Sequence, residues 1–171
     1  MRNKKSIFLS LLLFYTVSVF CQAPSVSASE FNKLAGCWEG QLTYLDYGTN
    51  KPFSMPANLQ VTRISNTKSF VLANIYPEEP KANANDTIII SGDGSYINKE
   101  KITSKQIDKD GTVRLTTELS GEDGNDQKQA LFRFSYLLSP TGFTFRKEVQ
   151  FTGNKEWILR HEYIYKTVHC K

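Results

Sequence analysis

The chain has 171 residues, with 21 lysines and arginines against 17 aspartates and glutamates, and a formal charge of +4. Three of the basic residues (Arg2, Lys4 and Lys5) lie in the first 21 residues, which hold no acidic residue, so the remaining 150 residues carry 18 basic and 17 acidic side chains. A domain so close to neutral lacks the basic surface that nucleic-acid binding requires, which excludes that partner. Its length is enough for one domain with its own core.

Residues 1–21 are typical of a secretory signal peptide. A basic start precedes an apolar run over residues 7–20, which is shorter than the roughly 20 residues of a membrane-spanning helix. Cleavage after Cys21 or after Ala23 would release a protein exported to the periplasm or the exterior. Acylation of Cys21, as in a lipoprotein, is the alternative, and the bulky Phe20 just before it disfavours that.

Two further cysteines, Cys37 and Cys170, stand at the two ends of the predicted domain. In an oxidising compartment such a pair is a disulfide candidate. Closing so long a loop would contribute about 4–5 kcal/mol of stability in the chain-entropy model. The alternative is two unrelated thiols, one of them on a frayed tail.

After a flexible lead-in over residues 22–29, the domain is predicted to occupy residues 30–171. It begins with a short helical turn capped by Ser29 and ended by Gly36. Apolar and polar residues then alternate in short segments separated by tight turns and by one polar loop at residues 77–86, without a long helical pattern. The predicted strands are residues 38–44, 53–61, 69–76, 87–91, two short ones within 96–108, then 113–119, 130–138, 143–151 and 157–165.

This pattern predicts an all-β fold, a single antiparallel up-and-down barrel of about nine or ten strands. The faces opposite the aromatic ones are charged, which favours a barrel in water, not in a membrane. We expect a monomer that is not an integral membrane protein. The charged outward residues are Arg114, Glu118, Arg133, Arg146, Glu148, Arg160 and Glu162.

The closing hairpin, residues 143–166, is the segment whose register the charges select. A three-residue loop at residues 153–155 places Arg146 opposite Glu162 and Glu148 opposite Arg160, so that opposite charges face each other. Trp157 and Leu159 are predicted to lie on the other, inward face. On that face the same register places Lys147 opposite His161. The preceding hairpin, which joins residues 130–138 to residues 143–151, places Phe134 opposite Lys147.

A lysine on a covered face is costly unless it is paired, hydrated or in contact with an anion. Lys147 opposite His161 is therefore the best functional indication in the chain. Two structural explanations stay open beside a binding role. The lysine stem can pack inside while its amine reaches the barrel mouth. The histidine can be a core residue satisfied by Tyr163 or by a carbonyl group.

The run over residues 34–40 contains Gly36, Trp38 and Gly40 as Gly-x-Trp-x-Gly. A short helical turn leading to this motif resembles the entry of lipocalin-like barrels and of their nitrobindin-type and fatty-acid-binding relatives. The resemblance implies that Trp38 packs across the closed end of the barrel and that Gly40 lets the first strand bend. It also implies a small apolar or amphipathic ligand inside the barrel.

Three functions follow as hypotheses. The first is a carrier or sensor of a small amphipathic molecule. The inward residues would bind the head group of that molecule, which could be anionic. The second, implied by the nitrobindin-like resemblance, is a haem-binding barrel with His161 as the ligand of the iron. The third is a structural or interaction domain filled by its own aromatic side chains. The predicted ligand-binding residues are Lys147, His161, Tyr163, Tyr136, Phe134 and Phe145.

Catalysis is not predicted. The chain has no Gly-x-Ser-x-Gly, His-Glu-x-x-His or Cys-x-x-Cys motif. The acidic tip at residues 122–126 lacks the spacing of a calcium loop. We therefore expect neither an enzyme nor a metal site, and no cofactor unless His161 binds haem.

Overall fold

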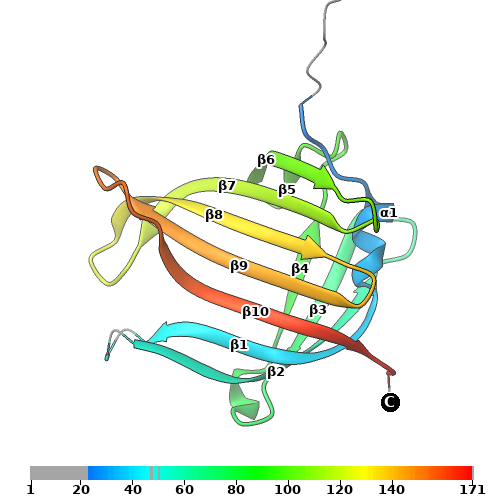
Figure 1. Cartoon of the computed structure of the whole chain (residues 1–171), viewed down its shortest axis with the longest axis horizontal. Helices are drawn as coiled ribbons and strands as arrows, with labels where there is room; N and C mark the ends of the chain where they lie inside the picture. The colour runs from blue at the N-terminus through cyan, green and yellow to red at the C-terminus, as the bar shows by residue number, and fades with distance from the viewer. Residues whose placement is uncertain (1–22, 47, 50, 171) are drawn as a thin grey trace, which may run out of the picture.

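Ten antiparallel strands form one strongly curved sheet, a nearly closed up-and-down barrel (Figure 1). The computed structural model describes residues 23–46, 48–49 and 51–170, so the predicted signal peptide lies outside the described residues. The elements are α1 (Ala28–Phe31), a 3-10 helix (Asn32–Leu34), β1 (Gly36–Asp46), β2 (Lys51–Arg63), β3 (Ser69–Ile75), a second 3-10 helix (Pro80–Ala82), β4 (Ala84–Ile89), β5 (Tyr96–Ile97), β6 (Glu100–Ile107), β7 (Val113–Asp123), β8 (Lys128–Leu138), β9 (Gly142–Phe151) and β10 (Ile158–Val168).

The predicted fold class is confirmed, and so are the two short strands within residues 96–108. Alternating apolar residues turn one face of each strand to the interior, as the period of two requires. One difference lies in the polar loop predicted over residues 77–86, which holds the second 3-10 helix and the start of β4. The polar Ala84–Ile89 segment pairs with β3 although its side chains are mostly exposed, because backbone hydrogen bonds form the ladder.

The sheet does not close along its full length. Its two edge strands are β4 and β5, and among the described residues one isolated bridge, Ile90 to Ile97, joins them. Strand β6 pairs with β7 on one side, but on the other it pairs only with the two residues of β5. We call the unpaired stretch between β4 and β6 the seam. It is the place where the barrel wall is open.

Strands β1 and β10 join the two ends of the chain. Cys37 and Cys170 form a disulfide with an S–S distance of 2.09 Å, which confirms the predicted pair. Trp38 is buried, and its indole N–H donates to the Leu34 carbonyl group at 2.8 Å. A Cβ atom at Gly40 would lie 2.1 Å from the Ile164 carbonyl oxygen. Glycine is therefore required at residue 40 because the backbone of β10 passes so close.

One end of the barrel is covered by α1 (Figure 1). Phe31 is fully buried and packs against Phe70 and Tyr136. The N-cap is Ser27 and not the predicted Ser29, because Ser27 forms a capping box with Glu30. The helix therefore begins two residues earlier than the apolar pattern indicates.

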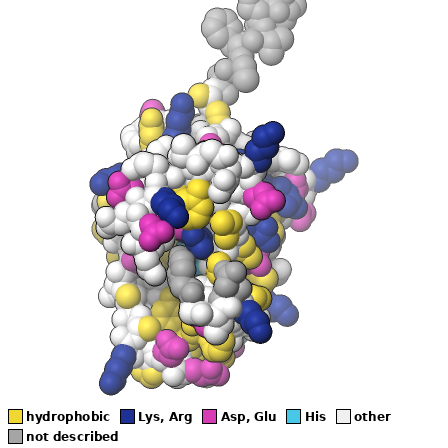
Figure 2. Space-filling view, turned by 90° about the vertical axis from the view of Figure 1, so that its left-hand side faces the viewer, with side chains coloured by type: hydrophobic (Ala, Val, Ile, Leu, Met, Phe, Trp, Pro, Cys, Tyr) yellow, Lys and Arg dark blue, Asp and Glu magenta, His cyan; other side chains and the backbone are white. Residues whose placement is uncertain are grey.

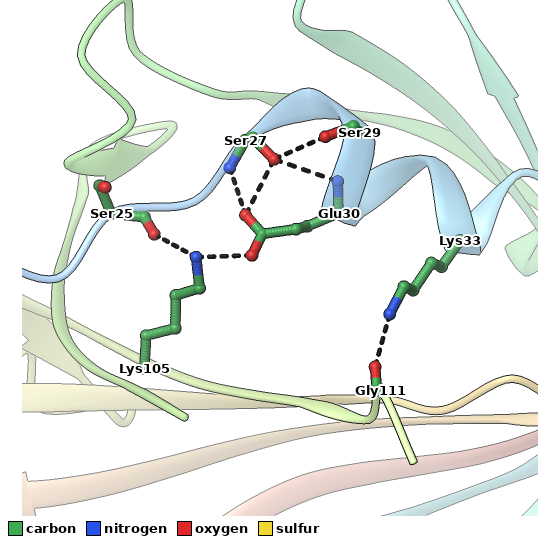
Figure 3. Close-up of polar contacts among 7 residues, drawn as sticks. All are labelled: Ser25, Ser27, Ser29, Glu30, Lys33, Lys105 and Gly111. Carbon is green, nitrogen blue, oxygen red and sulfur yellow. Dashed lines mark hydrogen bonds and ion pairs between the residues drawn. The ribbon is translucent and has the colours of Figure 1, made fainter. Parts of the chain in front are cut away.

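Polar contacts hold α1 and the segment before it to the barrel (Figure 3). The Nζ atom of Lys105, on β6, lies 2.6 Å from Oε1 of Glu30 and donates a hydrogen bond to the Ser25 carbonyl group at 2.8 Å. Val26 is 4% exposed, and its N–H donates to the Gly94 carbonyl group. The segment predicted as a flexible lead-in thus contributes buried contacts in its second half.

The closing hairpin confirms part of the predicted register and corrects the rest. Arg146 pairs with Glu162 and Lys147 with His161, as predicted. A β-bulge between Leu159 and His161 then shifts the pairing, so Glu148 faces Leu159 and the predicted opposition of Glu148 and Arg160 is wrong. The connection spans residues 152–157 and is longer than the three-residue loop that the pattern indicated.

The bulge also reverses which side chains face the interior. Leu159, predicted to be inward, is 38% exposed. Trp157, also predicted to be inward, precedes β10. The guanidinium carbon of Arg133 lies over its indole ring, 3.8 Å from the ring centre. Arg160, predicted to be outward, is only 10% exposed. An extra residue in one strand changes the alternation beyond it, which accounts for all three differences.

Candidate functional site

A cavity of about 290 Å³ lies inside the barrel and reaches the seam. Its wall combines residues of β2, β3, β8, β9 and β10 with residues from both edges of the seam. Asp86 on β4 and Asn98, just before β6, are both exposed, so the cavity opens to solvent there. The lining residues are Leu59, Leu72, Asn74, Asp86, Thr87, Ile88, Asn98, Glu100, Tyr136, Phe143, Phe145, His161, Tyr163 and Tyr165.

Glu100 places a carboxylate at the wall of this cavity. One of its oxygens, Oε2, accepts hydrogen bonds from the Thr117 hydroxyl at 2.6 Å and from the Tyr136 hydroxyl at 3.1 Å. Burial raises the pKa of Glu100, while these two hydrogen bonds and the charge of Lys147 oppose that rise. Both donors use the same oxygen, so Oε1 accepts no hydrogen bond from the residues that the structure describes.

His161 lies on the inward face of β10 and lines the cavity. Its ring packs between Phe145 and Tyr163, with centroid distances of 5.7 and 5.5 Å. Burial and then the charge of Lys147 lower its pKa to about 4, so the imidazole is neutral near pH 7. Its Nε2 atom is buried and has no hydrogen-bond partner among the described residues. Neither of the two partners considered for a structural histidine, Tyr163 or a carbonyl group, satisfies this nitrogen.

Tyrosines form much of the remaining wall. The hydroxyls of Tyr163 and Tyr76 share a hydrogen bond at 2.9 Å, and the rings of Tyr163 and Tyr165 stack with centroids 5.7 Å apart. Burial is the main cause of the raised pKa values of Tyr163 and Tyr165, so both hydroxyls stay protonated in any ordinary buffer. These residues present aromatic faces and hydroxyl groups together.

A charged cluster, composed of Asp123, Lys147 and Arg160, lies farther toward the other end of the barrel. Arg160 Nε donates to Asp123 Oδ2 at 2.8 Å, and both side chains are 10% exposed. Lys147 Nζ is 4.0 Å from Asp123 Oδ1 and 4.4 Å from the ring centre of Phe132. Figure 2, which faces this end, shows basic and acidic side chains interspersed with hydrophobic ones.

The structure brings most of the predicted binding residues together. His161, Tyr163, Tyr136 and Phe145 line one cavity. Lys147 and Phe134 do not line it. Phe134 lies beside it, stacked on Phe145 at 6.0 Å, and Lys147 contacts the charged cluster.

Sequence reasoning missed Glu100, Asp86 and Asn98, and it placed Asp123 at a solvated tip. Glu100 lies in the segment where the alternation was weakest. Asp86 fell in the predicted polar loop. Their approach across the seam depends on how the sheet curls, which no local pattern encodes. Asp123 is turned inward by its contact with Arg160, and that contact depends on the bulge.

Within the described residues, no group of three or more histidine, cysteine, aspartate or glutamate side chains is arranged to hold a metal ion. In the same part of the chain, no helix is both long enough and apolar enough to cross a membrane.

The comparisons with known proteins identify the fold and no family. No family model and no curated protein matches the chain. The crystal structure of Rv2717c from M. tuberculosis matches 85% of this chain and 100% of its own length, with 10% sequence identity and a TM-score of 0.55. That likeness is one of fold alone.

A protein of unknown function of the DUF3598 family from Nostoc punctiforme also aligns with 85% of this chain, at 14% identity and a TM-score of 0.45. The chain spans half of that protein.

Asp123→Asn removes the negative charge that faces two interior cations, so we expect the free energy of unfolding to fall by about 3–5 kcal/mol. Asp126→Asn is the matched control, because Asp126 pairs with Lys128 and both side chains are well exposed, at 73% and 64%. That change should cost less than about 1 kcal/mol. Urea unfolding measures both, and equal effects would contradict the interior placement of Asp123.

The depressed pKa of His161 predicts a pH dependence of stability. As pH falls from 6.5 to about 4, the unfolded chain takes up a proton on this histidine before the folded one does. The unfolding free energy should therefore decrease over that window by about 3 kcal/mol from this group. In His161→Gln that part of the decrease should be absent, whereas His169→Gln, at an exposed position, should behave as the wild type. Identical pH profiles for wild type and His161→Gln would show that the imidazole is not buried.

Proposed function

We propose that this protein is an exported barrel that binds a small amphipathic molecule in the cavity behind the seam, as a carrier or sensor. The observation that carries the proposal is the cavity itself. It is lined on one side by aromatic rings and on the other by polar groups that converge on it. A pocket that is mostly apolar with a few placed polar groups is the usual form of a small-molecule site.

The size of the cavity supports a small ligand. Its volume of about 290 Å³ lies just below the range for ligand pockets, which begins at about 300 Å³, so only a small ligand would fit. A purely structural barrel would fill this space with its own side chains, as the closed end does around Phe31 and Phe70. The contrast between a filled end and an open middle favours binding over a structural role.

The disulfide supports export, because such bonds persist in oxidising compartments. Together with the predicted signal peptide, it favours the periplasm or the exterior as the place of action, for a protein that acts as a monomer. The resemblance to lipocalin-like barrels agrees with a carrier or sensor. On this proposal the residues in contact with the ligand are Tyr136, Phe145, His161 and Tyr163.

Filling the cavity with a larger side chain should weaken ligand binding. Leu72 lies on β3 at the cavity wall, and Leu72→Trp should weaken binding of the neutral fluorescent probe N-phenyl-1-naphthylamine at least ten-fold (about 1.4 kcal/mol). Ile164→Trp, at an exposed outward position of β10, is the matched control and should leave the affinity unchanged. A fluorescence titration measures both. If the wild-type protein binds the probe and Leu72→Trp binds it equally well, the cavity is not the binding site.

A second function, haem binding, is favoured by one observation. The Nε2 atom of His161 is buried without a hydrogen-bond partner, and the ring is neutral, which is the form that ligates a metal. An unsatisfied buried nitrogen of this kind calls for an explanation. If bound, haem would supply an iron centre able to bind small molecules or to transfer electrons, and His161 is the residue that would hold the iron.

Haem titration separates this function from the first. If His161 ligates iron, wild-type protein should show a shifted Soret band at one equivalent of haem, and His161→Ala should lose it. His169→Ala is the control and should keep the band, because residue 169 lies beyond β10. A spectrum that is the same for all three proteins would exclude His161 as a haem ligand.

A further inference from the structure

The charges around the cavity indicate the chemical class of the ligand. Resting on the proposed function, we infer that the ligand carries a protonated amine beside an aromatic or apolar body, and that Glu100 is its counter-ion. Among the described residues that line the cavity there are two carboxylates, Asp86 and Glu100, and no lysine or arginine. An anionic head, which the sequence suggested through Lys147, would meet like charge there.

The interior cations are engaged elsewhere. Lys147 and Arg160 both contact Asp123, and Lys147 also lies over the ring of Phe132. Neither side chain lines the cavity. Asp123 therefore offsets the positive charge in the charged cluster. Glu100 lines the cavity, and its Oε1 atom accepts no hydrogen bond from the described residues.

Glu100 is held in one orientation. Thr117 and Tyr136 both donate to its Oε2, which leaves Oε1 as an acceptor at the cavity wall. A carboxylate oxygen forms a stronger hydrogen bond with a charged donor than with a neutral one. A protonated amine supplies such a donor and also neutralises a carboxylate whose burial is otherwise costly.

Asp86 is placed to attract the same charge from outside. It is exposed at the seam, and Asn74 Nδ2 donates to its Oδ2 at 2.8 Å, which orients the carboxylate. A carboxylate at the mouth of a cleft raises the local concentration of cations and their rate of entry. Two acidic groups, one at the mouth and one inside, thus lie along a single path.

The aromatic wall suits the rest of such a molecule. The rings of Tyr136 and Phe145 are 4.9 Å apart, and those of Phe145 and Tyr163 are 6.3 Å apart. Aromatic faces attract ammonium groups and also pack against apolar rings. His161 is neutral at pH 7 because its pKa is about 4, so it adds no repulsion.

Three indole compounds whose head groups differ in charge test the inference: tryptamine (a cation), tryptophol (neutral) and indole-3-acetate (an anion). Isothermal titration calorimetry at pH 7.5 should give tryptamine a dissociation constant about ten-fold lower than that of tryptophol, with indole-3-acetate weaker still. The affinity for tryptamine should fall as salt is added, and that for tryptophol should not.

Glu100→Gln should remove the preference, lowering the affinity for tryptamine about ten-fold while leaving that for tryptophol within about two-fold. Glu118→Gln is the matched control, because Glu118 lies on the outward face of β7 and pairs with Arg133. Circular dichroism checks folding. If Glu100→Gln does not fold, Asp86→Asn at the exposed mouth replaces it, with an expected loss of about three-fold for tryptamine alone.

The outcomes separate the inference from the proposed function. If tryptophol or indole-3-acetate binds as tightly as tryptamine, or if none of the three binds while N-phenyl-1-naphthylamine does, the amine inference is overturned and the proposed function stands. If none of the four compounds binds, the proposed function fails as well. A preference for tryptamine that survives in folded Glu100→Gln, or undiminished in Asp86→Asn where that variant replaces it, overturns the assignment of the counter-ion.

Discussion

Incomplete closure of the sheet is the constraint on which the interior of this barrel depends. Strands β4 and β5 are the two edges, and the bridge between Ile90 and Ile97 joins them near the end that α1 covers. Beyond that bridge, β4 and β6 present unpaired edges. Exposed edges invite pairing with other chains, and proteins protect them with charged or polar residues. Asp86 and Asn98 meet that requirement, and the same residues line the mouth of the cavity.

Inside the barrel, a bulge decides where the positive charge lies. The extra residue in β10 turns Arg160 inward, where it reaches Asp123 at the end of β7. Lys147 contacts the same carboxylate from β9. One irregularity of the backbone therefore collects two cations and one anion in the charged cluster, while Glu100 stays at the cavity with only neutral donors. The two carboxylates that line the cavity favour a cationic ligand, and they do so although the charge of Lys147 also acts on Glu100.

Local pattern predicted much of the fold. The alternation in β8, β9 and most of β10 and the opposed charges of Arg146 and Glu162 fixed the register there, because a slip by one residue would expose the aromatic face. The two cysteines at the ends of the domain predicted the disulfide. These features depend on neighbours in sequence or on adjacent strands, which a single sequence displays.

The candidate site was only half predictable, because its other half depends on the curl of the whole sheet. His161 and Tyr163 were found from their own strand. Glu100 was not, since it reaches the cavity from the short, irregular region around β5 and β6. The bulge at Arg160 leaves no mark in the residue pattern, because a charged residue at that position reads as an outward one. Lys147 was correctly placed inside, but its partner, Asp123, is the last residue of β7, which lies two strands away from β9.

A crystal structure of the protein grown with tryptamine would show whether the cavity behind the seam is a binding site for cations. We expect the indole ring to lie against Phe145 and Tyr163, with the ammonium nitrogen within about 3 Å of Glu100 Oε1. Tryptamine bound only on the outer face, or bound inside with its ammonium directed away from Glu100, would contradict it.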